Sequence, residues 1–149
     1  MDLYRVQDEV IRPDALHEVV LADSDGAVTS FAGTVRDNTK GRGTSFLEYD
    51  AYREMAVKKM KEIGEEIKEK WDVASVGILH RLGRLEIGEI SVLIAISSPH
   101  RVASLEACHY AIDRLKETVP IWKKEVWTDG GAAWIEGDMS APSKSGTSG

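Results

Sequence analysis

The sequence predicts an α+β protein in which two long amphipathic helices pack against a mostly antiparallel sheet. Apolar residues recur at helical spacing in two stretches, 53–71 and 98–119, so each stretch has one face to bury. Short runs rich in β-branched and aromatic residues, bounded by glycines and polar turns, precede, separate and follow these stretches. Helices packed on one sheet are a stable way to bury both kinds of apolar face.

The composition fits one domain. The chain has 149 residues, of which 42% are hydrophobic and 30% charged, enough to build a core and too apolar for a disordered chain. We expect the folded unit to span residues 1–138. Residues 139–149 are dominated by serine and glycine and are expected to form a flexible tail.

Charge and cysteine usage exclude several classes of function. The formal net charge of -6 argues against a general nucleic-acid coat, and no apolar run is long enough for a membrane span or a signal peptide. The single cysteine, Cys108, cannot form an internal disulfide, and no Cys/His set has metal-site spacing. We therefore expect a cytoplasmic protein.

In the first half of the chain, Pro13 opens a short helix with Leu16, Val19 and Val20 inside. Strands are expected at 27–36 and 45–52, joined by the polar, glycine-containing segment 37–43, which has the composition of a mobile loop. The first long helix follows, and its buried face is expected to carry Ala56, Met60, Ile63 and Ile67.

The second half is expected to begin with strands at 73–82 and 90–97, the latter apolar enough to be buried on both faces. Ser98 and Pro99 have the residue types of a helix cap and a first helical position. Pro120 ends this helix, and segments 121–127 and 132–137 around a TDGG turn read as a β-hairpin. The inner face of the helix is predicted to carry Leu105, Cys108, Ile112, Leu115 and Val119.

Cations lie near both ends of the second long helix. His100 and Arg101 lie near its beginning, where free backbone N–H groups attract anions, although a solvent-facing pair is an equally simple interpretation. Lys116 lies in its last turn, and Lys123 follows beyond the proline. Two such ammonium groups that converge would bind an anion and favour proton transfer or nucleophilic attack.

Strand alternation separates the neighbours of Lys123. Lys124 is expected on the opposite face of its strand, whereas Glu125 returns to the Lys123 side and can orient that lysine. Arg36 ends a strand and opens the 37–43 loop. His80 is expected to serve strand pairing, and Cys108 to be a buried, inert thiol.

Five segments carry a resemblance to a known family. FAGTVRD (31–37), LEYDAY (47–52), HRLGRLEIGE (80–89), SSPHR (97–101) and LKETVPIWKKE (115–125) resemble the large, catalytic subunit of molybdopterin synthase. The similarity runs in the expected order from about residue 4 to residue 137. The resemblance implies an α/β-hammerhead-like fold and a homodimer within a heterotetramer, each large subunit binding a small ubiquitin-like sulfur carrier.

The resemblance also implies an activity. The C-terminal thiocarboxylate of the carrier supplies sulfur to cyclic pyranopterin monophosphate, and two transfers build the dithiolene of molybdopterin. The enzyme has no cofactor or metal of its own. Carried over position by position, Lys116 and Lys123 match the active-site lysines, and the remaining substrate-binding positions are Arg36, His100, Arg101, Lys124 and Glu125.

One position departs from the family. Some members carry an arginine after the last tryptophan strand that reaches the neighbouring chain, but this chain has Asp138 in that segment and no arginine. Either another cation replaces it, for example from the 37–43 loop, or the contribution is absent. Two other functions remain open: a non-catalytic module that binds a ubiquitin-like carrier tail, and a phosphate-ester hydrolase, which lacks a visible metal set or activated nucleophile.

Overall fold

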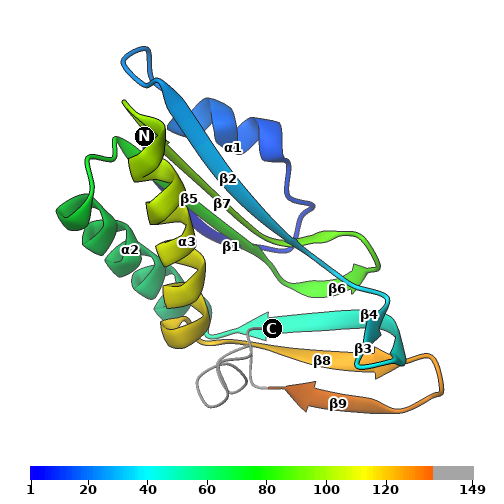
Figure 1. Ribbon diagram of the computed structural model, residues 1–149. Coiled ribbons are helices and arrows are strands. Elements are labelled where there is room, and N and C mark those ends of the chain that lie inside the picture. The colour runs from blue at the N-terminus through cyan, green and yellow to red at the C-terminus, as the bar shows by residue number, and fades with distance from the viewer. Residues whose placement is uncertain (136–149) are drawn as a thin grey trace.

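The computed structural model describes residues 1–135, so the predicted tail and Asp138 lie outside the described residues. This part of the chain forms three helices and nine strands (Figure 1). The helices are α1 (Pro13–Val20), α2 (Arg53–Lys70) and α3 (Arg101–Thr118). The strands are β1 (Leu3–Gln7), β2 (Ala27–Thr34), β3 (Asn38–Thr39), β4 (Arg42–Ala51), β5 (Ser75–Arg81), β6 (Gly83–Glu86), β7 (Ile90–Ser98), β8 (Ile121–Trp127) and β9 (Ala132–Ile135).

A four-stranded sheet in the order β1-β5-β7-β2 carries the main core. Its β1–β5 pair is parallel and the others are antiparallel. Helices α2 and α3 cover one face and α1 covers the other (Figure 1). Alternation along the strands serves both layers: Ile78 and Ile94 pack under the long helices, whereas Leu79 and Leu93 pack under α1.

A second sheet, in the order β3-β4-β8-β9 with β6 beside β4, lies below the ends of the long helices (Figure 1). The chain joins the two parts directly, because β4 runs into α2 and α3 runs into β8 across Pro120. The C-terminal end of α3 is therefore held where the two sheets meet. None of the helices in residues 1–135 is long and apolar enough to cross a membrane.

The α+β class, both long helices, the short helix and the C-terminal hairpin are confirmed. The strands divide into two sheets, a detail that the sequence does not predict, since β4 and β8 pair with each other and leave the main sheet. Strands β1 and β6 were not predicted. Both are short and rich in polar residues, so their apolar pattern is weak, and the pairing with β5 and β4 stabilises them.

The start of α3 also differs from the prediction. Ser98 still belongs to β7, His100 is the N-cap, and Arg101 is the first helical residue. Leu105 is 54% exposed and does not belong to the buried face. Small side chains take its place against the sheet and allow close packing; the buried residues of α3 are Ser104, Ala107, Cys108, Ala111 and Leu115.

The 37–43 segment is a β-hairpin, which corrects the loop prediction. Strand β3 pairs with the start of β4, and Lys40 and Gly41 turn the chain with positive φ angles of 52° and 85°. Arg42 binds both carboxylate oxygens of Asp129 in the β8–β9 turn and lies 4.3 Å from the Trp127 ring centroid. The hydrogen bonds from Arg42 lower the pKa of Asp129. These contacts of Arg42 fix the hairpin against the β8–β9 end of the second sheet.

Packing of α2 on β1 gives a stability prediction. A Cβ on Gly64 would overlap the hydroxyl of Tyr4 and lie 2.6 Å from its Cζ. We expect Gly64→Ala to lower the free energy of unfolding by about 1–3 kcal/mol, because overpacking outweighs the gain in helix propensity of about 1 kcal/mol. Urea denaturation measures this loss. In a Tyr4→Ala background the same change should cost nothing, and an equal cost in both backgrounds would contradict the steric explanation.

Candidate active site

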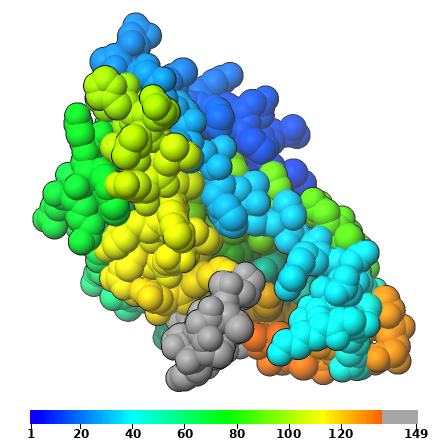
Figure 2. Space-filling model, viewed as in Figure 1, coloured from blue at the N-terminus to red at the C-terminus, as the bar shows by residue number. Residues whose placement is uncertain are grey.

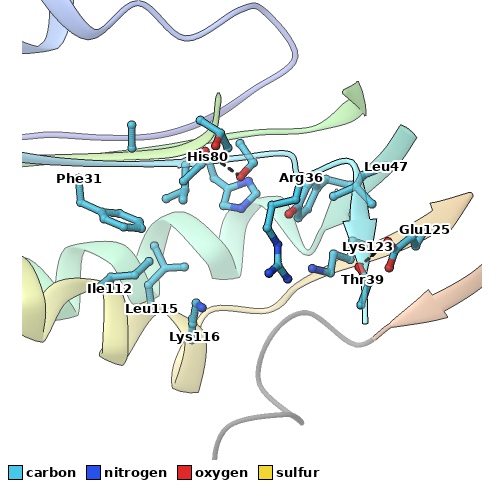
Figure 3. A pocket seen from close by; sticks show the side chains of 16 residues that line it. Phe31, Arg36, Thr39, Leu47, His80, Ile112, Leu115, Lys116, Lys123 and Glu125 are labelled. Carbon is cyan, nitrogen blue, oxygen red and sulfur yellow. Dashed lines mark hydrogen bonds between the residues drawn. The ribbon is translucent and has the colours of Figure 1, made fainter. Parts of the chain in front are cut away.

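A cavity of about 330 Å³ lies where the C-terminal end of α3, the end of β2 and the second sheet meet (Figure 3). Both apolar and polar side chains line it. The apolar lining includes Phe31, Leu47, Val92, Ile112 and Leu115. The polar lining includes Arg36, Thr39, Tyr49, His80, Ser91, Lys116, Lys123 and Glu125.

Three cations from separate elements share this cavity. Arg36 follows β2, Lys116 lies in the last turn of α3, and Lys123 lies on β8. Figure 3 shows their charged ends directed into the same space. Three positive charges around one partly enclosed volume create a local positive potential that suits a small anion, whatever the net charge of the whole chain.

Glu125 supplies a carboxylate beside these cations. It is only 3% exposed, and its Oε2 accepts hydrogen bonds from the hydroxyls of Thr39 and Thr44. A buried carboxylate requires such donors. The two threonines were not predicted for the site, since only the β3–β4 hairpin brings them to β8. The expected orientation of Lys123 and Glu125 toward one face is confirmed.

Lys124 lies on the other face of β8, as the alternation predicts. Its Nζ is 3.8 Å from Glu48 Oε1 and 5.9 Å from the Trp134 ring centroid. The side chain is not part of the cavity lining. Within one chain, the role in substrate binding that the resemblance implies for Lys124 therefore has no support from its position.

His100 and Arg101 are far from this cavity. They lie at the first turn of α3, and Lys116 lies fifteen residues further along the same helix. At 1.5 Å per residue, the separation along the helix axis is about 22 Å. Both side chains are exposed. One chain thus brings together Arg36, Lys116, Lys123 and Glu125, but not the His-Arg pair.

Two lining residues with aromatic rings, Tyr49 and His80, were not predicted for the site. Tyr49 lies on β4, and its ring contacts the His80 imidazole edge-on, with centroids 4.9 Å apart. His80 was assigned to strand pairing. Strand register is what places both residues at the cavity, because Tyr49 lies opposite Lys123 and His80 lies opposite Val92, and both partners line it.

Cys108 is buried against the four-stranded sheet, as predicted, and burial raises the pKa of its thiol to about 11. We expect it to resist a disulfide-exchange reagent at pH 8 in the native protein and to react rapidly once urea unfolds the chain, because only the thiolate is nucleophilic. Absorbance of the released thiol reports the rate. Rapid labelling of the native protein would contradict the buried position.

No group of three or more His, Cys, Asp or Glu side chains in the described residues is arranged to hold a metal ion. The chemistry available in this cavity is that of ammonium, guanidinium, imidazole, phenol and carboxylate groups. The fold and the cavity define an α+β protein with a cavity into which three cationic side chains converge.

The comparisons with known proteins assign the family. The MoaE protein family matches residues 6–118, more than half of the chain. A molybdopterin synthase catalytic subunit from Halalkalibacterium halodurans is 48% identical over 141 residues, covering 95% of this chain and 83% of the relative. One from Bacillus subtilis is 50% identical over 135 residues, covering 91% and 85%. The chain therefore belongs to the MoaE family, and the resemblance of the five segments is confirmed.

Solved structures agree. Molybdopterin synthase from Staphylococcus aureus matches with a TM-score of 0.85 at 48% identity, covering 91% of this chain and 98% of that one. A MoaE protein from Burkholderia ambifaria matches with a TM-score of 0.79 at 30% identity, covering 92% and 90%. The arrangement of two sheets and three helices is thus a family architecture.

Proposed function

We propose that this chain is the catalytic subunit of a molybdopterin synthase. It transfers sulfur from the C-terminal thiocarboxylate of a small ubiquitin-like carrier to cyclic pyranopterin monophosphate. The observation that carries the proposal is the convergence of Arg36, Lys116 and Lys123 on one cavity. The relatives' name, a catalytic subunit, supports the presence of at least one further subunit.

The charges of the cavity fit this reaction. The phosphate of the substrate and the thiocarboxylate of the carrier are both anions, and attack on the substrate develops further negative charge. Preorganised cations stabilise that charge. We assign Lys123 to binding of the carrier tail or the substrate. We assign Lys116 to proton transfer and stabilisation of the intermediate. If the two lysines exchanged these roles, the electrostatic argument would be unchanged. Glu125, fixed by two threonine hydroxyls, limits how far the β8 backbone beside Lys123 can move.

A complete site requires a second copy of the chain. His100 and Arg101 match substrate-binding positions of the family but lie about 22 Å along α3 from Lys116. They reach the cavity of a second copy if the α3 helices of the two copies lie side by side and antiparallel, so that the beginning of one faces the end of the other. A homodimer with two shared sites follows from two-fold symmetry.

The surface between the two ends of α3 supports this arrangement. Val102 is 57% exposed and Leu105 54%, and both lie on the same side of the helix. Phe31 on the neighbouring edge strand β2 is 38% exposed. Figure 2 shows α3 and β2 beside each other on one face of the molecule. An apolar strip from the His-Arg pair toward the cavity is the surface that a second copy would cover.

The remaining assignments complete the proposal. Arg42 is bound to Asp129 and does not replace the cross-dimer arginine that is missing near Asp138; the partner's His-Arg pair supplies positive charge instead. The protein works in the cytoplasm, without a resident cofactor or metal, and the assembly is a homodimer with one carrier bound at each end.

A reconstituted assay tests this function. The protein is mixed with thiocarboxylated carrier and cyclic pyranopterin monophosphate, and molybdopterin is detected as its fluorescent oxidation product. We expect product only when all three components are present. Carrier binding by calorimetry without product, after the cognate carrier has been used, would favour the non-catalytic binding module. Phosphate release from simple esters would favour a hydrolase.

A further inference from the structure

Glu125 places a negative charge among the cations of the proposed site. Its carboxylate is 3% exposed and lines the same cavity as Arg36, Lys116 and Lys123. Lys123 lies two residues away on the same face of β8, and Arg36 is directed into the same space (Figure 3). A carboxylate that paired with these cations would reduce the positive potential that favours an anionic substrate. The orientation of Glu125 therefore affects how strongly the cavity binds an anion.

Two threonine hydroxyls hold this carboxylate through one of its oxygens. The hydroxyl of Thr39 donates to Glu125 Oε2 over 2.8 Å, and the hydroxyl of Thr44 donates to the same atom. Thr39 is half-buried on β3, and Thr44, on β4, is 4% exposed. Hydrogen bonds to an ionised acceptor are stronger than those between neutral groups. The negative charge thus has local partners that carry no positive charge.

The β3–β4 hairpin that supplies both hydroxyls is anchored to the second sheet. Arg42 binds both carboxylate oxygens of Asp129, and the backbone N–H of Thr128 donates to the carbonyl oxygen of Gly43 over 2.9 Å. These contacts hold the hairpin at a fixed position beside β8. The hydroxyls therefore define one orientation of the Glu125 carboxylate.

We propose that Thr39 and Thr44 are positioning residues, which hold the carboxylate of Glu125 at the wall of the cavity and keep it from pairing with the cations there. The cations are then available to the phosphate or the thiocarboxylate. This inference rests on the proposed function, and it adds that anion affinity depends on two hydroxyls that act through Glu125. A buried carboxylate that loses its donors is unfavourable unless it turns toward a positive charge.

Valine and serine substitutions separate the hydroxyl from the shape of the side chain. Thr39→Val and Thr44→Val each remove one hydroxyl and keep the branched shape, whereas Thr39→Ser and Thr44→Ser keep the hydroxyl. Thr128→Val is a matched control, because the Thr128 hydroxyl donates to Gly43 of the same hairpin and Thr128 does not line the cavity. Phosphorus NMR titration with inorganic phosphate measures anion affinity, and the reconstituted assay measures kcat and KM for cyclic pyranopterin monophosphate.

We expect each valine variant to bind inorganic phosphate about 3- to 10-fold more weakly, because one hydrogen bond to the charged carboxylate is lost. KM should rise by a similar factor while kcat changes little, since the anion is bound before the reaction starts. The serine variants and Thr128→Val should match the wild type. Adding Glu125→Gln to either valine variant should restore phosphate affinity, because a neutral amide cannot neutralise the cations.

Unchanged phosphate affinity in Thr39→Val would overturn the inference, and the half-buried position of Thr39 lets this variant fold even if Thr44→Val does not. Weaker binding that Glu125→Gln does not restore, or that Thr128→Val reproduces, would also overturn it, since the hairpin rather than the carboxylate would then be disturbed. Absence of phosphate binding by the wild-type protein would overturn it too. Failure of the proposed function gives a different result, because the wild-type protein would form no product while its phosphate titrations still reported on the carboxylate.

Discussion

Lys116→Ala and Lys123→Ala should each reduce molybdopterin formation by about 100-fold or more while the fold survives. Removing one preorganised group that stabilises developing charge typically costs 10²–10³ in rate, and loss of a proton-transfer group costs a similar factor. Both lysines are only half-buried and lie at the edge of the core, so truncation leaves the packing of α3 intact. The reconstituted assay under single-turnover conditions measures the loss.

Lys61→Ala is the matched control, because Lys61 is an exposed lysine on α2 and does not line the cavity. It should retain wild-type product formation. Urea denaturation should give similar midpoints for all three variants. Full activity in both cavity variants would exclude the assigned site, and loss of activity in Lys61→Ala would point to a general charge effect.

Arg101→Ala should reduce product formation by about 10- to 100-fold, although the residue lies about 22 Å along α3 from Lys116 in its own chain. The physical reason is the loss of a bidentate hydrogen-bonded contact from the guanidinium group to a phosphate or carboxylate in the partner's cavity. The loss should appear mainly as an increased KM, because the contact is present before the reaction starts.

Arg5→Ala provides the control for arginine loss, since Arg5 is exposed on β1 and lies outside the cavity. Size-exclusion chromatography at the assay concentration determines whether Arg101→Ala remains a dimer. A dimeric Arg101→Ala variant with unchanged KM and kcat would contradict the shared site.

The sequence predicts best where one local pattern decides the outcome. The helical spacing of Ala56, Met60, Ile63 and Ile67 defines the buried face of α2, and all four side chains are buried. Alternation along β8 likewise separates Lys124 from the cavity. Such features depend on neighbours along the chain, so they can be recognised before any tertiary contact is known.

Features that depend on distant pairing could not be predicted in the same way. The sequence assigned His80 to a strand, but only the packing of β5 under the long helices turns its ring into the cavity. The buried hydrogen bonds of Glu125 require the β3–β4 hairpin, which has the composition of a loop. Leu105 fits the helical period yet is exposed, because small residues of α3 face the sheet.

The site itself shows the same division. The motif around Lys116 and Lys123 identified two residues that line the cavity, and the residue types at the start of α3 predict an anion-binding pair at His100 and Arg101. Motif matching does not report that these two groups lie at opposite ends of one helix. That separation emerges only from the fold, and it leads to the proposal of a shared site.

Mixing two impaired variants, at a substrate concentration below the wild-type KM, tests the central claim most directly. Lys116→Ala and Arg101→Ala proteins are combined in equal amounts, exchanged to equilibrium and assayed for molybdopterin. If each site uses Lys116 of one copy and Arg101 of the other, half of the dimers contain one intact site, and about a quarter of the wild-type activity returns. If both residues act within one chain, no mixed dimer has an intact site. Activity that stays at the level of the separate variants, with subunit exchange verified, would contradict the account.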